Sequence, residues 1–96
     1  MKKTFELTHP KIKVARMVES AKHEVKKYLK RERNKKLPEG ADYWDFDCKI
    51  GKSEQTADVI HVTAISQEID TLVAAELSAF YLEILVKSAV RTFEEK

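Results

Sequence analysis

The feature that most constrains the fold is a long amphipathic segment in the N-terminal third of the chain. Apolar side chains recur there at intervals of three and four residues, the spacing that places them on one side of an α-helix over about six turns. Thr8 and His9 are suited to cap such a helix, and Pro10 is suited to its first turn. Pro38 disfavours the helical conformation in the residue before it, so we expect a helix from about Pro10 that ends by Leu37. The expected buried stripe consists of Val14, Val18, Ala21, Val25, Tyr28 or Leu29, and Glu32.

The other side of this helix is strongly basic. Met1 to Lys36 contain 13 Lys or Arg against 4 Asp or Glu, and Leu37 to Lys96 contain 5 against 12, although the formal net charge is only +2. A row of cations on a helix can neutralise phosphates, which predicts contact with RNA, the ribosome or another polyanion. Three alternatives stay open: an ordinary solvated face, contact with an acidic protein, and charge complementarity between the two parts of the chain. The candidate polyanion-binding residues are His23, Lys26, Lys27, Lys30, Arg31 and Arg33.

Segments with alternating polar and apolar side chains predict the strands. Residues 4–7, 43–50 and 80–86 alternate, and in the second of these Trp44, Phe46, Cys48 and Ile50 share the side expected to be buried. Residues 51–56 are polar and long enough only for a hairpin loop, so residues 57–62 are expected to form a neighbouring antiparallel strand. Thr63 then caps a second helix. Its stripe consists of Ile65, Ile69, Leu72, Val73 and Leu77.

This order of elements predicts an α+β fold. It is β-α-β-β-α-β, as in the ferredoxin-like two-layer sandwich, where two helices cover one face of a four-stranded antiparallel sheet. If residues 57–62 instead begin the second helix, a β-α-β-α-β arrangement with a three-stranded sheet results. The 96 residues suit a single domain, with a frayed polar tail at about 91–96.

In either arrangement one face of the sheet lacks helices. Tyr43, Tyr81 and Leu85 project from that face and form a candidate interaction surface, for another protein or for a second copy of the chain. Asp45, Asp47 and His61 form a weaker candidate for binding a metal or small molecule there. The chain has no zinc-ligand spacing, so the sequence does not indicate a specific metal site or a cofactor.

The sequence offers little support for catalysis or for a membrane. No Gly-rich phosphate loop or G-x-S-x-G motif is present, and we expect a protein that is not an enzyme. Cys48, the lone cysteine, is expected to be a buried strand residue, which fits a reducing cytoplasm. No apolar run is long enough to span a bilayer, and the N-terminus does not resemble a signal peptide.

Several segments together resemble an uncharacterised family of small bacterial proteins about 100 residues long. They are residues 2–5, 22–33, 37–40, 44–49 and 80–85. Members of that family tend to follow the last strand with a Pro-Gly pair and a His before Arg-Thr, where this chain has Ser88, Ala89 and Val90, so a role for that His does not carry over. The resemblance implies a bacterial, cytoplasmic domain that occupies the whole chain, and it implies no activity.

Overall fold

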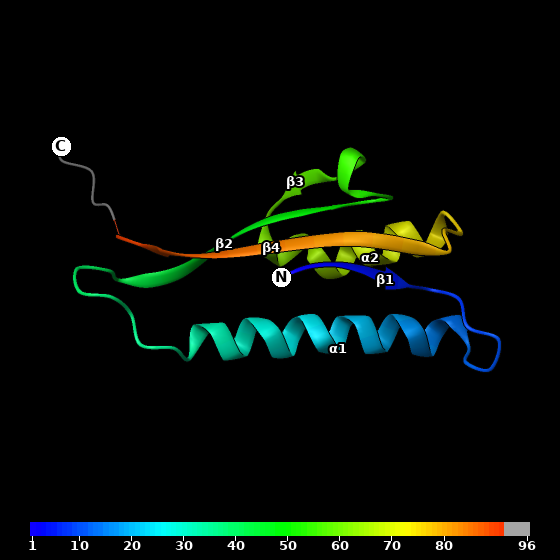
Figure 1. Ribbon diagram of the computed structural model, residues 1–96, viewed down its shortest axis with the longest axis horizontal. Helices are drawn as coiled ribbons and strands as arrows, with labels where there is room; N and C mark the ends of the chain where they lie inside the picture. The colour runs from blue at the N-terminus through cyan, green and yellow to red at the C-terminus, as the bar shows by residue number, and fades with distance from the viewer. Residues whose placement is uncertain (92–96) are drawn as a thin grey trace.

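The computed structural model describes residues 1–91 and has a layer of strands with two helices packed against it (Figure 1). Its elements follow the order β1 (Lys2–Glu6), α1 (Val14–Arg33), β2 (Tyr43–Gly51), η1 (Glu54–Thr56), β3 (Asp58–Ile60), η2 (Val62–Ala64), α2 (Ile65–Ala74) and β4 (Ala79–Ala89). The α+β class and the β-α-β-β-α-β order are therefore confirmed, and the three-stranded alternative is wrong. Apart from Arg91, the tail predicted over residues 91–96 lies outside the described residues.

All strand pairs are antiparallel, and the sheet order is β1-β4-β2-β3. The two longest strands, β2 and β4, are therefore central, and the short β1 and β3 form the edges. In a ferredoxin sheet the first and third strands are central, so this chain shares that fold's element order and layers but not its strand order. The residues predicted as strand 57–62 pair with β2 only over Asp58–Ile60, before η2 begins.

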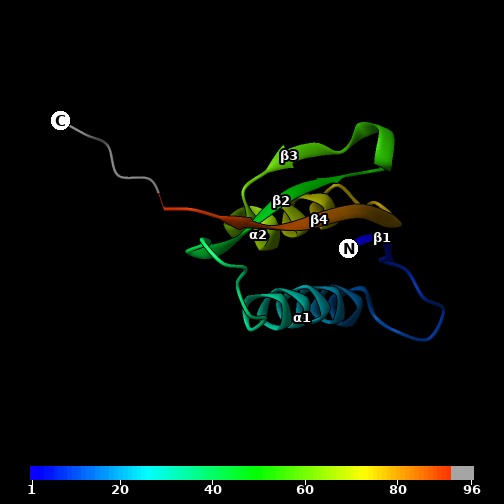
Figure 2. The same cartoon turned by 60° about the vertical axis from the view of Figure 1, so that its left-hand side comes forward.

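The core lies between the helices and one face of the sheet. The predicted alternation holds for Phe46, Cys48 and Ile50 of β2, which are buried, whereas Trp44, predicted to be buried with them, is only half-buried. From β4, Phe80, Leu82 and Ile84 are buried on the same face. They pack against the apolar stripes of α1 and α2, which are buried at Val18, Ala21, Val25, Ile65 and Ile69. Figure 2 separates the strand layer from α1 beneath it.

The ends of the helices differ from prediction. Helix α1 begins at Val14 rather than Pro10, and neither Thr8 nor His9 caps it; instead the His9 ring accepts a hydrogen bond from the Lys11 amide at 3.0 Å. The helix ends at Arg33, with Asn34 as its C-cap. Residues 10–13 therefore lie outside the helix, in the loop that joins β1 to α1.

The second helix is also shorter than its apolar stripe. Thr63 is not its cap: the Thr63 amide donates to Nδ1 of His61, which caps η2, and α2 starts only at Ile65. At the other end, Glu76 has a φ of 59°, a left-handed conformation that stops the helix before Leu77.

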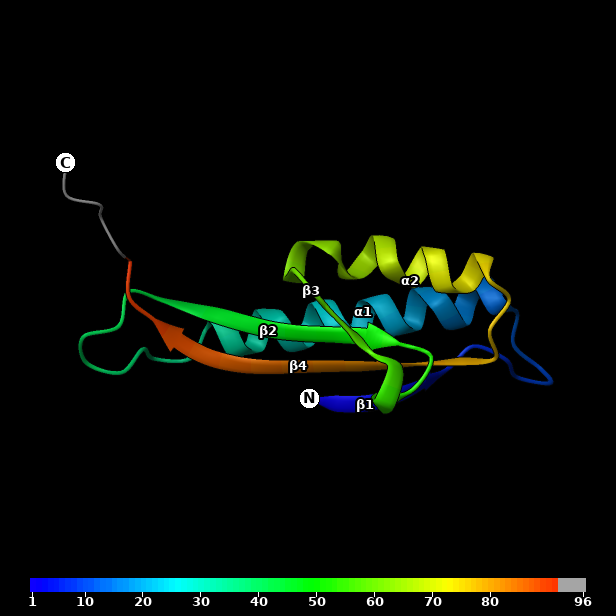
Figure 3. The same cartoon turned by 90° about the horizontal axis from the view of Figure 1, so that it is seen from above.

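The face of the sheet away from the helices is partly covered. Figures 1 and 3 show that the β2–β3 hairpin, including η1, curls over this face. Tyr81 of β4, which points to this side, is consequently buried. The predicted uncovered face therefore lacks helices but is not fully open.

Candidate functional site: the basic face of α1 and the adjoining groove

Helix α1 holds its basic side chains in place through its buried stripe. Val18, Ala21 and Val25 pack one side of the helix against the sheet, so the basic side chains on its other sides face solvent. Glu32, at the end of the stripe, is also buried, and its carboxylate accepts the Lys35 ammonium at 2.8 Å. The Lys35 ammonium offsets the cost of burying this carboxylate at the end of the stripe.

All six predicted polyanion-binding residues lie on α1 with exposed side chains: His23, Lys26, Lys27, Lys30, Arg31 and Arg33. They do not form one cluster. Arg31 points to one flank, where its guanidinium lies 5.6 Å from the centre of the Tyr28 ring. Arg33 lies on the flank toward α2, with its guanidinium 5.2 Å from the centre of the Phe46 ring.

The charges of Lys26, Lys27 and Lys30 are not neutralised within the part of the chain that the structure describes. Within residues 1–91, none of the three forms an ion pair. The ion pairs that α1 makes to other elements lie nearer its N-terminus, where Glu24 binds Lys3 at 2.6 Å and Lys22 binds Asp70 at 2.6 Å. The exposed part of α1 formed by Lys26, Lys27 and Lys30, the basic flank, is therefore open to an external anion.

Several acidic residues of the C-terminal part lie away from α1, on the other face of the sheet. On the sheet face away from the helices, Asp45, Asp47 and Glu83 alternate with lysines, and Lys87 binds Asp47 at 3.0 Å. This hydrogen bond and the charge of Asp47 raise the pKa of Lys87. Among the ion pairs within residues 1–91, only Lys22–Asp70 joins the basic N-terminal part to the acidic remainder, so this complementarity leaves Lys26, Lys27 and Lys30 unbalanced.

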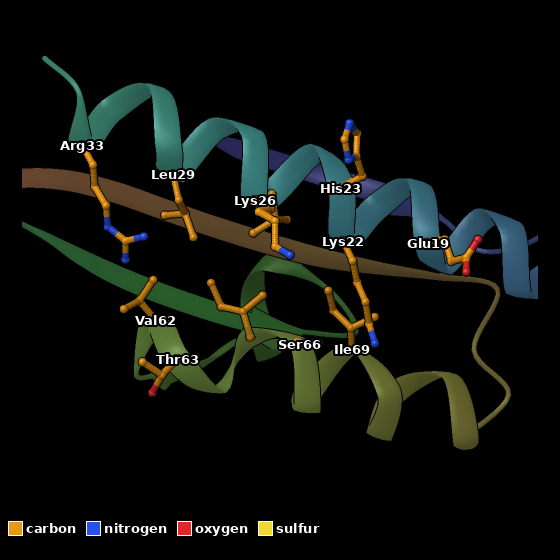
Figure 4. Close-up of a pocket in the computed structure, with 12 residues that line it drawn as sticks. Glu19, Lys22, His23, Lys26, Leu29, Arg33, Val62, Thr63, Ser66 and Ile69 are labelled. Carbon is orange, nitrogen blue, oxygen red and sulfur yellow. The ribbon is translucent and has the colours of Figure 1, made fainter.

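A groove of about 500 Å³ adjoins the basic flank, between α1 and the η2–α2 segment (Figure 4). Its apolar residues come from both sides: Val25 and Leu29 from α1, and Val62, Ile65 and Ile69 from η2 and α2. Lys22, Lys26 and Arg33 line the α1 wall, and Thr63 and Ser66 line the opposite wall. His23 is also among the lining residues, although its ring points away from the groove in Figure 4.

Sequence reasoning missed this groove, although part of its signal was present. Positions 22, 26, 29 and 33 follow intervals of three and four, so they share a flank of the helix that is adjacent to the buried stripe. That flank combines cations with the apolar Leu29. What the sequence could not supply was the second wall, because it depends on α2 lying beside α1.

The predicted interaction surface is only partly available. Tyr43 and Leu85 are exposed, at 39% and 43% of their full area. Tyr81 is 7% exposed, and its hydroxyl donates to Glu83 Oε1 at 2.8 Å. Burial, followed by this hydrogen bond and the nearby carboxylates of Glu83 and Glu54, raises the pKa of Tyr81 to about 12. Tyr81 therefore does not belong to an exposed contact surface.

The weaker candidate at Asp45, Asp47 and His61 does not assemble into a site. Asp45 Oδ1 accepts the Phe46 amide at 2.8 Å, Asp47 binds Lys87, and the His61 ring caps η2. In the part of the chain that the structure describes, no group of three His, Cys, Asp or Glu side chains is placed to hold a metal ion. Within these residues the weaker candidate is therefore not assembled as a three-ligand metal site, and each of its side chains already has a local partner.

Cys48 is a buried strand residue, as predicted. Its thiol is 1% exposed, and burial, followed by the charges of Asp47 and Asp45, raises its pKa to about 11. A thiol that stays protonated and enclosed is a poor nucleophile. No helix within residues 1–91 combines the length and apolarity needed to cross a membrane.

The fold and site together define a small two-layer α+β domain with an unbalanced basic helix. The chain belongs to a family of unknown function, DUF6172, whose model matches residues 1–95. The resemblance noted from the sequence is thereby confirmed over nearly the whole chain. Neither the curated proteins nor the solved structures compared with it contain a match.

Proposed function

We propose that this protein binds RNA, free or in the ribosome, through the basic flank of α1 and without catalysing a reaction on it. The observation that carries the proposal is the set of Lys26, Lys27 and Lys30, which are exposed and form no ion pair within residues 1–91. The buried, unpaired Cys48 is compatible with action in a reducing cytoplasm.

The arrangement of these lysines costs stability, and this favours a function for it. Like charges four residues apart on a helix destabilise it by about 0.2–0.5 kcal/mol per pair, and Lys26 and Lys30 are such a pair. Lys27 and Arg31 are another. Within residues 1–91 neither Lys26 nor Lys30 has an acidic partner, and in the second pair only Arg31 has one, Glu32 at 3.9 Å. Glu24 and Asp70 neutralise other cations. An anionic partner would relieve the repulsion.

The arrangement also suits a phosphate backbone in its dimensions. Residues 23 to 33 span about 15 Å along the axis at 1.5 Å per residue. Phosphate contacts over such a row give affinity that does not depend on base sequence. The open face of the sheet is less suitable, since carboxylates of Asp45, Asp47 and Glu83 lie on it.

The test compares two triple variants of equal net charge. Lys26→Gln, Lys27→Gln and Lys30→Gln remove the unpaired cations, whereas Lys2→Gln, Lys49→Gln and Lys52→Gln remove three lysines elsewhere. Binding of each variant to a fluorescent RNA hairpin is followed by anisotropy from about 50 to 200 mM salt. Each lost phosphate contact lowers the salt slope by about 0.7–0.9, so three contacts correspond to a difference of about 20- to 40-fold over this range.

The α1 variant is expected to lose both affinity and salt sensitivity, and the control variant to keep them. Equal losses in the two would mean that net charge alone governs binding, and unchanged binding in the α1 variant would refute the proposal. Co-sedimentation with ribosomes, with and without nuclease treatment, then distinguishes free RNA from the ribosome as the partner.

A further inference from the structure

The groove between α1 and the η2–α2 segment has the features of a separate ligand site. We propose that it binds a small phosphate monoester whose alcohol portion is apolar. Binding in this groove is a function in addition to RNA binding, because contacts with a phosphate backbone need neither an apolar surface nor a second wall.

The size and lining of the groove suit a small molecule. Ligand pockets commonly measure about 300–1,000 Å³ and are mostly apolar with a few polar groups, and this groove measures about 500 Å³. Leu29 of α1 and Val62 of η2 are half-buried and offer apolar contacts from the two sides, whereas Ile69 is fully buried (Figure 4). An aliphatic chain or a ring can therefore be covered on both sides.

The polar groups around the groove favour an anion. Lys26 and Arg33 line it, and neither forms an ion pair within the described residues. The opposite wall adds the hydroxyls of Thr63 and Ser66, and Ser66 lies in the first turn of α2, where the helix dipole is positive. The one carboxylate in the lining, Glu19, lies at the other end of the α1 wall in Figure 4.

The charge at this end matches a phosphate monoester. Two cations without acidic partners face a group that carries about −1.5 to −2 at pH 7. Lys26 and Arg33 are seven residues apart, about 10 Å along the helix axis, so one phosphate can accept from either cation together with a hydroxyl of the opposite wall. Such charge-assisted hydrogen bonds are among the strongest available to a protein.

The two walls of the groove are joined by an ion pair, 2.6 Å long, between Lys22 of α1 and Asp70 of α2. In Figure 4 Arg33 and Val62 lie at the end of the groove away from Lys22. An apolar body can lie between the walls while its phosphate stays at a cation of the α1 wall.

The experiment titrates the full, ¹⁵N-labelled chain with monomeric octyl phosphate and follows its amide NMR signals. Saturable shifts are expected in residues 26–33 and 62–69. Inorganic phosphate, which lacks the apolar body, and 1-octanol, which lacks the charge, should each bind at least about tenfold more weakly. The variant Ser66→Phe fills the groove from an exposed position and should weaken octyl phosphate binding by about tenfold or more, as should Lys26→Gln.

Lys27→Gln is the matched control, because Lys27 is exposed on α1 but does not line the groove. It should lower RNA affinity and leave octyl phosphate binding within twofold, whereas Ser66→Phe should do the opposite. The proposal is overturned by the absence of saturable shifts, by inorganic phosphate binding equally well, or by unchanged binding in both Ser66→Phe and Lys26→Gln. Binding confined to vesicles that contain phosphatidic acid would likewise overturn it and would indicate a membrane surface instead.

Discussion

Replacing Lys26 by Gln should make the protein more stable and, at the same time, a weaker RNA binder. Lys26 is exposed on α1, with Lys22 four residues before it and Lys30 four residues after it. Gln has nearly the same helix propensity as Lys, so the substitution removes a charge and changes little else in the helix. Stability and binding should therefore respond in opposite directions to a single change.

The magnitude follows from the two like-charge neighbours. At about 0.2–0.5 kcal/mol each, their removal gives about 0.4–1 kcal/mol, with the lower end favoured because Lys22 is already paired with Asp70. For a domain of this size, the gain corresponds to a rise in Tm of roughly 2–6 °C. The RNA salt slope should fall by about 0.7–0.9, the contribution of one phosphate contact.

Differential scanning calorimetry at low and high salt measures the first effect. Since salt screens exposed charges, with a Debye length of about 3 Å at 1 M, the gain should disappear at high salt. Lys49→Gln is the control and should lower the Tm, because Lys49 lies across from Glu83 in the sheet and the substitution removes this attraction. A Tm for Lys26→Gln that is unchanged or lower at low salt would refute the reasoning that the basic flank is costly to the fold.

Three further predictions test the fold and its surfaces. Gly51→Ala should destabilise the protein by about 1–3 kcal/mol in urea titrations, because an added Cβ would lie 2.8 Å from Ala57 Cα. Gly40→Ala is the comparison: an added Cβ there would have no atom within 4 Å, so the destabilisation should be only about 1 kcal/mol, caused by the φ of 87°. Burial raises the pKa of Cys48 from 9.0 to about 11, so the folded state holds this proton more tightly than the unfolded state. The free energy of unfolding should therefore fall as pH rises from 9 to 11, and less steeply in Cys48→Ala. If exposed Tyr43 and Leu85 mediate a homodimer, light scattering should detect it, and Leu85→Lys should abolish it; a monomer at high micromolar concentration would contradict this prediction.

The periodic parts of the fold were predictable from the sequence. The stripe on α1 and the alternation on β2 and β4 are set by which side must be buried, and burial follows directly from side-chain type. Even Glu32, unusual in an apolar stripe, is buried as its position indicates, because Lys35 lies three residues on and neutralises it.

The element ends and the pairing of distant segments were less predictable. Several residues near each helix start can act as caps, and the choice depends on local geometry: His61, rather than Thr63, accepts the hydrogen bond before α2. Tyr81 has the alternation of an exposed residue, yet the hairpin containing Glu54 curls over it. The strand order and the groove depend on contacts between elements far apart in sequence, on which periodicity carries no information.

Whether the basic and the acidic part of the chain neutralise each other depends on how the helices and the sheet pack together. A basic N-terminal part and an acidic remainder could have neutralised each other across the two layers, and Lys22–Asp70 is such a pair, whereas Lys3–Glu24 joins two elements of the N-terminal part. Both pairs involve the first three turns of α1. Beyond Val25 the helix faces a groove lined by Val62, Thr63 and Ser66 instead of carboxylates, so Lys26 and Arg33 meet apolar and hydroxyl groups. If the octyl phosphate test succeeds while Lys27→Gln impairs only RNA binding, this one helix presents two anion sites, a flank for a phosphate backbone and a groove for a monoester.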